Sequence, residues 1–281
     1  MSLDSASLTD WLATPPGRCL LDWETAQFEH AVSDIFGYHA VQLGFAPLDA
    51  LASNRMPHRW LAVDNLEPPK FMPSDAGVPR TPRTPRRSPA FAADPTALPF
   101  AQGSLDLLAM PHTLDMSQDP HAALREAERV LVPEGRVVIT GLNPNSLWGL
   151  RQSRSRFYRH LGGHDQKGAL FLPGTQQMIG YWRLRDWLRL LNFEVESARF
   201  GGYAPSFASQ KWLDRFSWMD ALGQRWWPIF GAMYCVVAVK RVRGMRLLEP
   251  GWRTRKTVAG APAAVASKDA ASRSASNGSN A

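Results

Sequence analysis

Cysteine, long hydrophobic runs and a secretory leader are scarce or missing in this sequence. The 281 residues include two cysteines, Cys19 and Cys235, which are too few for a disulfide framework and typical of a reducing compartment. No apolar run approaches the roughly 20 residues of a membrane-spanning helix. The first residues, MSLDSASLTDWLATPP, include acids and no apolar run of the signal-peptide type. We therefore expect a cytoplasmic protein without a transmembrane helix.

Positive charge is concentrated in two segments of the chain. The formal net charge of +7 at pH 7 raises the hypothesis of nucleic-acid binding. Residues 80–87, RTPRTPRR, carry four arginines, and five basic residues with one acid follow from Arg253 onward, so the remainder is close to neutral. This distribution weakens the hypothesis of a basic active groove. We expect no DNA partner, while RNA or an acidic carrier protein at the arginine-rich segments stays open.

Composition divides the chain into three parts. Residues 1–36 are predicted as an N-terminal helical lead-in, and 37–245 as one α/β domain. The domain contains a proline- and arginine-rich loop at 77–89 and a tryptophan-rich cap at 201–230. Residues 246–281 end in an alanine-, serine- and glycine-rich stretch that has too few large apolar residues to form a core, so we expect a disordered tail.

Helix and strand patterns alternate through the central part. Helical spacing of apolar residues predicts helices over about 22–36 and 183–191, and Asp119-Pro120 is a typical helix start. Residues 133–135, PEG, are predicted as the turn after the helix that starts at Asp119-Pro120. Seven apolar segments are predicted as strands, namely 39–45, 59–64, 90–94, 105–110, 136–142, 193–200 and 233–241. This alternation predicts a doubly wound, mostly parallel seven-stranded sheet with a mixed edge at its last two strands.

The stretch HAVQLGFAPLDAL, residues 39–51, has the outline of a cofactor-binding turn that lacks most of the usual glycines. An apolar strand reaches Gly44, and a short helical stretch is expected over 48–52. A nucleotide-binding turn normally has further glycines where FAP stands here, because they let the backbone approach the ligand. By itself the stretch fits a working cofactor turn, an eroded one or an unrelated strand end.

The most specific pattern is in residues 92–144, AADPTALPFAQGSLDLLAMPHTLDMSQDPHAALREAERVLVPEGRVVITGLNP. It contains an aspartate at a strand end, a Leu-Pro-Phe turn, an apolar strand and a helix that ends in RVLVPEG before a further strand. In these elements the chain resembles class I S-adenosylmethionine-dependent methyltransferases of the methyltransferase type 11 group, with Glu134 at a usual glycine position. The weaker resemblance covers about 36–242 and implies a Rossmann-like methyltransferase fold, with S-adenosylmethionine as cofactor.

The resemblance implies roles for residues at the carboxyl ends of the strands, where open parallel sheets bind ligands. Asp94 matches the carboxylate that receives the adenine amino group, and Asp64 matches the one that accepts bonds from the ribose hydroxyls. His112 is predicted to face the methionine part or the acceptor and is the candidate catalytic general base. The predicted cofactor-binding residues are Gln42, Gly44, Ala46, Asp64, Asp94, Pro95 and His112.

Each of these residues also has a structural interpretation. Asp94 before a proline and Asp64 before an asparagine are both common in ordinary turns. His112 fits a loop histidine with satisfied hydrogen bonds, and a structural role is favoured for Asp106 at the start of a buried strand. His160 and His164 have no set of partner ligands nearby, so no metal site is expected.

Two segments after the fifth predicted strand are candidates for substrate contact. The arginines of 149–160 fit an acidic substrate, a carrier protein or a solvated helix face. The tryptophans of 210–230 fit a cap packed on the sheet, or an apolar lid or peripheral membrane surface for a greasy substrate.

The function predicted from the sequence is methyl transfer from S-adenosylmethionine to a small-molecule or lipid-like acceptor. Gln42 stands where the family usually has an acidic residue, and Ala46 and Leu48 stand where it has glycines. These departures keep open an inactive methyltransferase-like binding or scaffold protein. An RNA methyltransferase or RNA-binding protein is the third alternative, based on the arginine-rich segments.

Overall fold

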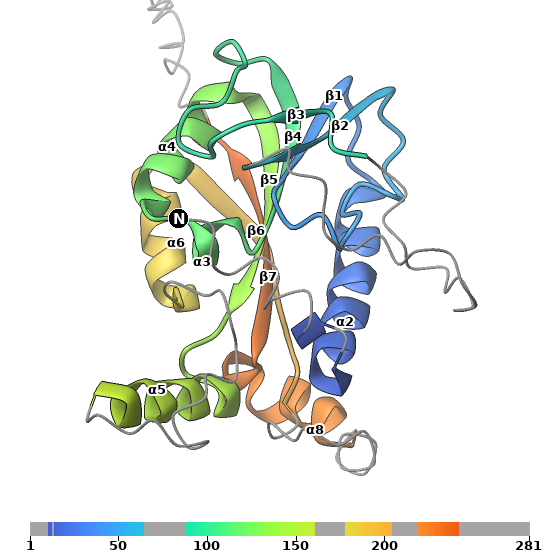
Figure 1. Cartoon of the computed structure of the whole chain (residues 1–281). Helices are drawn as coiled ribbons and strands as arrows, with labels where there is room; N and C mark the ends of the chain where they lie inside the picture. The colour runs from blue at the N-terminus through green and yellow to red at the C-terminus, as the bar shows by residue number, and fades with distance from the viewer. Residues whose placement is uncertain (1–10, 13, 65–87, 161–177, 204–217, 242–281) are drawn as a thin grey trace, which may run out of the picture. The chain divides into compact units, whose positions relative to one another are not determined.

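A seven-stranded sheet in the order β3-β2-β1-β4-β5-β7-β6 forms the centre of the computed structural model (Figure 1). The structure describes residues 11–12, 14–64, 88–160, 178–203 and 218–241. In chain order the strands are β1 (His39–Leu43), β2 (His58–Val63), β3 (Phe91–Ala92), β4 (Leu105–Pro111), β5 (Leu131–Leu142), β6 (Phe193–Gly201) and β7 (Met233–Lys240).

Strand directions follow the pattern of a doubly wound sheet with one reversed strand. The pairs β1–β2, β1–β4, β2–β3 and β4–β5 are parallel, whereas β7 is antiparallel to both β5 and β6. This arrangement confirms the prediction of a mostly parallel sheet with a mixed edge. It also brings the carboxyl ends of β1, β2, β3 and β4 to one edge, where the predicted site residues follow their strands.

Helices cover both faces of the sheet and create two hydrophobic cores (Figure 1). On one face lie α4 (Pro120–Val130) and α6 (Tyr181–Leu190), which bury Leu124 and Leu188. On the other face lies α2 (Pro15–Val32), which buries Leu20, Phe28 and Val32. The helix α5 (Leu147–His160), the helix α8 (Trp218–Trp226) and the short 3-10 helix η2 (Pro228–Phe230) lie toward the carboxyl end of β5.

Local sequence signals explain several element boundaries. Asp119 caps α4 by accepting a hydrogen bond from Ala122 N at 2.9 Å, and Pro120 occupies the first helical turn. Asp106 Oδ2 accepts bonds from the backbone nitrogens of Tyr38 and His39 at 2.8 and 2.9 Å. Asp106 therefore fixes the start of β1 against β4, which is the structural role favoured from the sequence.

Three predicted elements differ in the structure. The predicted helix over 22–36 begins earlier, because Pro15 and Pro16 are accommodated in its first turn, and ends at Val32. The helical stretch expected over 48–52 is wrong: these residues form turns, in which the Gln42 side chain bonds the Leu48 carbonyl and the Ala50 nitrogen. The turn predicted at 133–135 lies inside β5, where Glu134 has a φ of +65°.

Some predictions lie outside the described residues. These are most of the proline- and arginine-rich loop (77–87), the first part of the tryptophan-rich cap (204–217) and the tail (246–281). Among the helices that the structure describes, none combines the length and the apolar character needed to cross a bilayer.

The helix α2 is part of the folded core, which a matched pair of substitutions tests. Phe28→Ala removes a side chain that is 1% exposed and should lower the free energy of unfolding by about 3–5 kcal/mol. Phe36→Ala removes a phenyl ring that is 74% exposed and should change it by less than about 0.5 kcal/mol. Urea unfolding measures both. Equal, small effects would mean that α2 is not docked as described.

Candidate functional site

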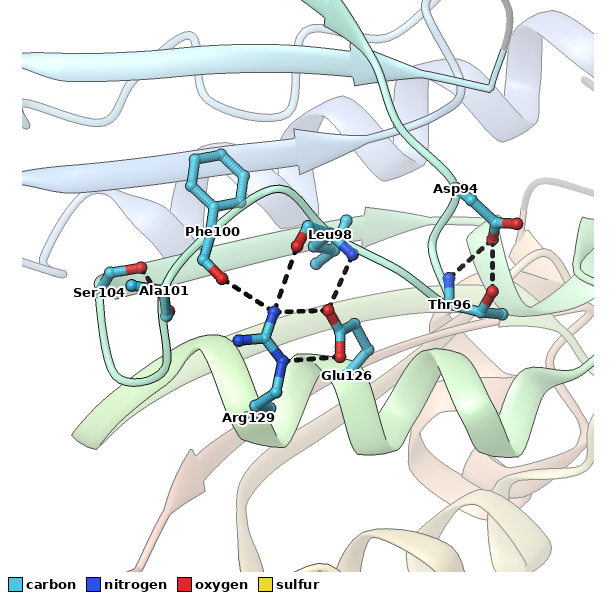
Figure 2. Close-up of polar contacts among 8 residues, drawn as sticks. All are labelled: Asp94, Thr96, Leu98, Phe100, Ala101, Ser104, Glu126 and Arg129. Atoms are coloured by element: carbon cyan, nitrogen blue, oxygen red, sulfur yellow. Dashed lines mark hydrogen bonds and ion pairs between the residues drawn. The ribbon is translucent and has the colours of Figure 1, made fainter.

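The loop that carries Asp94 is held in place by two residues of α4 (Figure 2). Arg129 Nη2 donates to the carbonyls of Leu98 and Phe100 at 3.2 and 2.8 Å, and Glu126 Oε1 accepts from Leu98 N at 2.8 Å. Arg129 and Glu126 also pair with each other at 2.6 Å, and this pairing lowers the pKa of Glu126. The Leu-Pro-Phe turn and the helix motif are therefore one hydrogen-bonded unit.

Asp94 forms a tight turn with Thr96 in the same loop (Figure 2). Its Oδ1 accepts bonds from Thr96 N at 2.8 Å and Thr96 Oγ1 at 2.7 Å, which lower the pKa of Asp94. The side chain is exposed, and the following Pro95 is buried. Asp94 thus has the turn role considered for it. Its second carboxylate oxygen is not needed for this turn and can accept a bond from a ligand.

Asp64 lies beyond the carboxyl end of β2 and close to Asp94. Partial burial, and then the negative charge of Asp94, raise the pKa of Asp64. The register pairs Val63 of β2 with Ala92 of β3, so the two aspartates follow neighbouring positions of adjacent parallel strands. The structure therefore brings together the two carboxylates that the resemblance assigns to ribose and adenine.

The turn after β1 is organised by the side chain of Gln42. Its Oε1 accepts from Ala50 N at 2.8 Å, and its Nε2 donates to the carbonyl of Leu48 at 2.6 Å. Gln42 is 1% exposed. Its amide thus serves both a donor and an acceptor of the backbone, which a carboxylate could not do. Gln42 therefore holds the turn together from its buried interior.

Gly44 and Phe45 give this turn its direction. Both have positive φ, +66° and +45°, which is ordinary for glycine and uncommon for phenylalanine. A Cβ on Gly44 would meet only Thr113 Oγ1, at 3.9 Å, so open space lies beside this backbone. Ala46 is half-buried in the turn that follows. Phe45 is buried, and its ring packs edge-on against His112 with centroids 5.0 Å apart.

His112 lies between two buried carboxylates at the carboxyl end of β4. Its Nε2 is 2.9 Å from Glu24 Oε1 of α2, and its Nδ1 is 3.0 Å from Asp115 Oδ2 of α3 (Thr113–Met116). Burial alone would lower the pKa of His112, but the charge of Glu24 and the hydrogen bond that His112 donates to Asp115 outweigh it and raise the pKa to about 10. The ring is therefore an imidazolium at neutral pH.

This buried charge cluster, Glu24, His112 and Asp115, connects three parts of the fold. Asp115 Oδ2 also accepts from Leu142 N at 3.0 Å, at the end of β5. Other buried polar atoms around the cluster have no hydrogen-bond partner among the described residues, namely Glu24 Oε2, Asp115 Oδ1, Thr140 Oγ1 and Tyr234 OH. Unsatisfied buried atoms of this kind indicate water or a ligand group at the site.

Glu24 is the site residue that sequence reasoning missed. It is completely buried, although the lead-in was expected to lie outside the common core. It stands four residues after Leu20 and four before Phe28, so it occupies an apolar row of α2. An acidic residue inside such a row was the signal that could have identified it.

The predicted site residues lie together at one edge, with different surroundings. Asp64 and Asp94 are exposed there, Gly44 borders open space, and Gln42, Pro95 and His112 are buried. Their ligand-binding and catalytic roles stay predictions. No group of three or more His, Cys, Asp or Glu side chains in the described parts of the chain is arranged so that it could hold a metal ion, and this includes the buried charge cluster.

Gln42 gives a prediction that opposes the family pattern. Gln42→Glu introduces the acidic residue that the family usually has, yet it removes the donor to the Leu48 carbonyl. We expect the free energy of unfolding to fall by about 1–3 kcal/mol, since a buried acceptor loses its partner. Gln102→Glu, at an exposed position, is the control for the charge. A Gln42→Glu protein as stable as the wild type would contradict this account of the turn.

The raised pKa of His112 predicts a stability that depends on pH. An unfolded histidine releases its proton near pH 6.5, whereas the folded one keeps it to about 10. The contribution of His112 to the free energy of unfolding is therefore complete below pH 6.5. It is lost as the pH rises toward 10, by up to about 1.4 kcal/mol per pH unit. Urea unfolding of wild type and His112→Gln between pH 7 and about 9 isolates it. Parallel curves for the two proteins would refute the buried imidazolium.

Comparison with known proteins finds matches to parts of this chain. Residues 74–139 match the family model described as a methyltransferase domain, which includes β3, β4, α4 and most of β5. The uncharacterized protein YafS of Escherichia coli is 44% identical over 109 residues, 38% of this chain and 41% of that protein. A malonyl-[acyl-carrier protein] O-methyltransferase of Halorhodospira halophila is 34% identical over 86 residues, 28% of this chain and 29% of that enzyme.

The chain spans less than half the length of the curated relatives that it matches. Among solved structures, an S-adenosylmethionine-dependent methyltransferase of Thermotoga maritima aligns over 79% of this chain and 92% of its own, with 15% identity and a TM-score of 0.48. Residues 74–139 are thus similar to a methyltransferase domain, and they supply β3, β4, α4 and most of β5 of the doubly wound sheet.

Proposed function

We propose that the protein transfers a methyl group from S-adenosylmethionine to a small-molecule or lipid-like acceptor. The observation that carries the proposal is the pair Asp64 and Asp94, which follow β2 and β3 at the carboxyl edge of the sheet and lie close enough for one charge to act on the other. The Asp94 loop belongs to the segment that matches the methyltransferase domain.

The residues at this edge fit the adenosine part of the cofactor. Exposed carboxylates accept hydrogen bonds only, which suits the ribose hydroxyls for Asp64 and the adenine amino group for Asp94. Open space beside Gly44 supports close approach of a ligand to the backbone of the first turn. Ala46 and Pro95 would then contribute to cofactor binding through the main chain and the shape of their turns. Gln42 would contribute by holding the turn after β1 in place.

The methionine part would lie near Phe45 and His112. When bound, the cofactor supplies an electrophilic methyl group on its sulfonium, and the protein needs to align the acceptor and exclude water. The buried ring of Phe45 provides an apolar wall for that purpose, and it packs against the charged ring of His112. His112 is protonated and contacts two carboxylates, which supports a positioning role in this conformation; its action as a general base stays a prediction.

The nature of the acceptor is argued from this chain's own surface. The name of the Halorhodospira halophila relative specifies malonyl-[acyl-carrier protein], but the match covers 28% of this chain. The helices α5 and α8 at the carboxyl edge expose leucine and tryptophan side chains. These apolar side chains at the carboxyl edge favour a lipid-like acceptor over a strongly polar one.

Binding of S-adenosylhomocysteine to the full chain tests the proposed function. Saturating ligand, at about 100 times its dissociation constant, should stabilise the wild type by about 2.7 kcal/mol in thermal unfolding. Asp64→Asn and Asp94→Asn should each weaken binding by about tenfold, a loss of about 1.4 kcal/mol, because each amide adds a donor where an acceptor is needed. In Asp94→Asn the amide oxygen can still accept the bonds from Thr96, so the turn is preserved.

Asp186→Asn, on the exposed face of α6, is the control and should bind like the wild type. Wild-type affinity in both site variants would refute the assigned cofactor site. Absence of any binding by the wild type at millimolar ligand would refute the proposed activity.

A further inference from the structure

Exposed apolar side chains are concentrated on three elements of the described chain. Ten large apolar residues are strongly exposed among the described residues, and six of them are on α5, α8, η2 or the residue that joins α8 to η2. We call these six the edge patch. They are Leu147, Leu150, Leu222, Trp226, Trp227 and Phe230, with exposures between 43% and 68%.

The edge patch lies at the end of the sheet that carries the candidate site. Leu142, the last residue of β5, pairs with Met233, the first residue of β7, so α5 and η2 adjoin the same end. Asn143 connects them directly, since its Nδ2 donates to the carbonyls of Ile229 and Gly231 at 2.6 and 2.9 Å. Figure 1 shows α5 and α8 together at this end of the sheet.

The charge of these elements is positive. The helix α5 contains four arginines and no acidic residue, and α8 with η2 adds Arg225 and a single acid, Asp220. Arg154 and Arg225 are exposed. Tryptophan next to arginine on an exposed apolar surface is the combination found at the boundary between water and lipid headgroups.

We propose that the edge patch binds the surface of an anionic lipid bilayer, with Trp226, Trp227 and Phe230 inserted at the headgroup level and Arg154 and Arg225 against lipid phosphates. The proposal deepens the proposed function, on which its acceptor class rests. A bilayer at this end would face the carboxyl end of the sheet, which also carries Asp64 and Asp94. Positive charge and aromatic anchors in one place favour this occupant over an uncharged apolar partner.

Sedimentation of the full chain with vesicles tests the proposal without cofactor, so it can fail independently of the proposed function. Wild-type protein should bind phosphatidylcholine vesicles that contain phosphatidylglycerol, and bind pure phosphatidylcholine vesicles more weakly. The variant Trp226→Ser/Trp227→Ser/Phe230→Ser keeps every charge, including those of the arginine-rich segments, and should bind on the order of tenfold more weakly. Each replaced ring is more than half exposed, so folding is preserved.

The matched control removes three exposed apolar side chains at the opposite end of the strands. Phe36→Ser/Tyr38→Ser/Leu190→Ser affects residues that are 74%, 70% and 80% exposed, which precede β1 and β6. It should bind vesicles like the wild type. Arg154→Glu/Arg225→Glu should weaken binding to the anionic vesicles and leave the weak binding to phosphatidylcholine unchanged.

Three outcomes would overturn the proposal. The first is that wild type does not sediment with anionic vesicles. The second is that the patch variant binds them as well as its control does. The third is that the edge patch proves to bind an acidic acyl carrier protein or a second copy of this chain, measured by gel filtration with light scattering, while vesicles are not bound.

Discussion

The ion pairs of the His112 imidazolium constrain the whole carboxyl edge of the sheet. Two carboxylates and one imidazolium are buried together, and any one of them left alone would carry a large desolvation penalty. Glu24 comes from α2, His112 follows β4, and Asp115 bonds to the end of β5. Because the charges must meet, α2 has to dock against the sheet, and a segment expected to be peripheral becomes part of the site.

The same edge contains three residues with left-handed backbone, Gly44, Phe45 and His112. Phenylalanine and histidine adopt this conformation at a cost, and it persists only where the surroundings enforce it. The surroundings here fix both residues. Gln42 bonds the backbone of the turn after β1, and Glu24 and Asp115 pair with the His112 ring. Phe45 and His112 then pack against each other. Rigid geometry at the end of β1 is thus achieved with one glycine and a buried amide.

Sequence reasoning succeeded where the determinants are local. The strands, the capped start of α4 and the Asp94 loop follow from apolar runs, an Asp-Pro pair and a motif whose members Glu126 and Arg129 bond to the loop itself. It failed for 48–52. Apolar residues there suggested a helix, but the Gln42 side chain, eight positions before Ala50, accepts a bond from the Ala50 nitrogen and favours a turn. It also missed Glu24, because its ion-pair partner His112 is 88 residues away and an acidic side chain is normally assigned to solvent.

The end of β5 links the interior of the site to the surface of the molecule. Leu142 N bonds to Asp115 of the buried cluster, and the next residue, Asn143, bonds to the backbone of η2 through its side chain. The exposed rings of Trp227 and Phe230 are therefore only a few covalent and hydrogen bonds from His112. The end of β5 therefore joins the buried charge cluster on one side to the elements that carry the edge patch on the other.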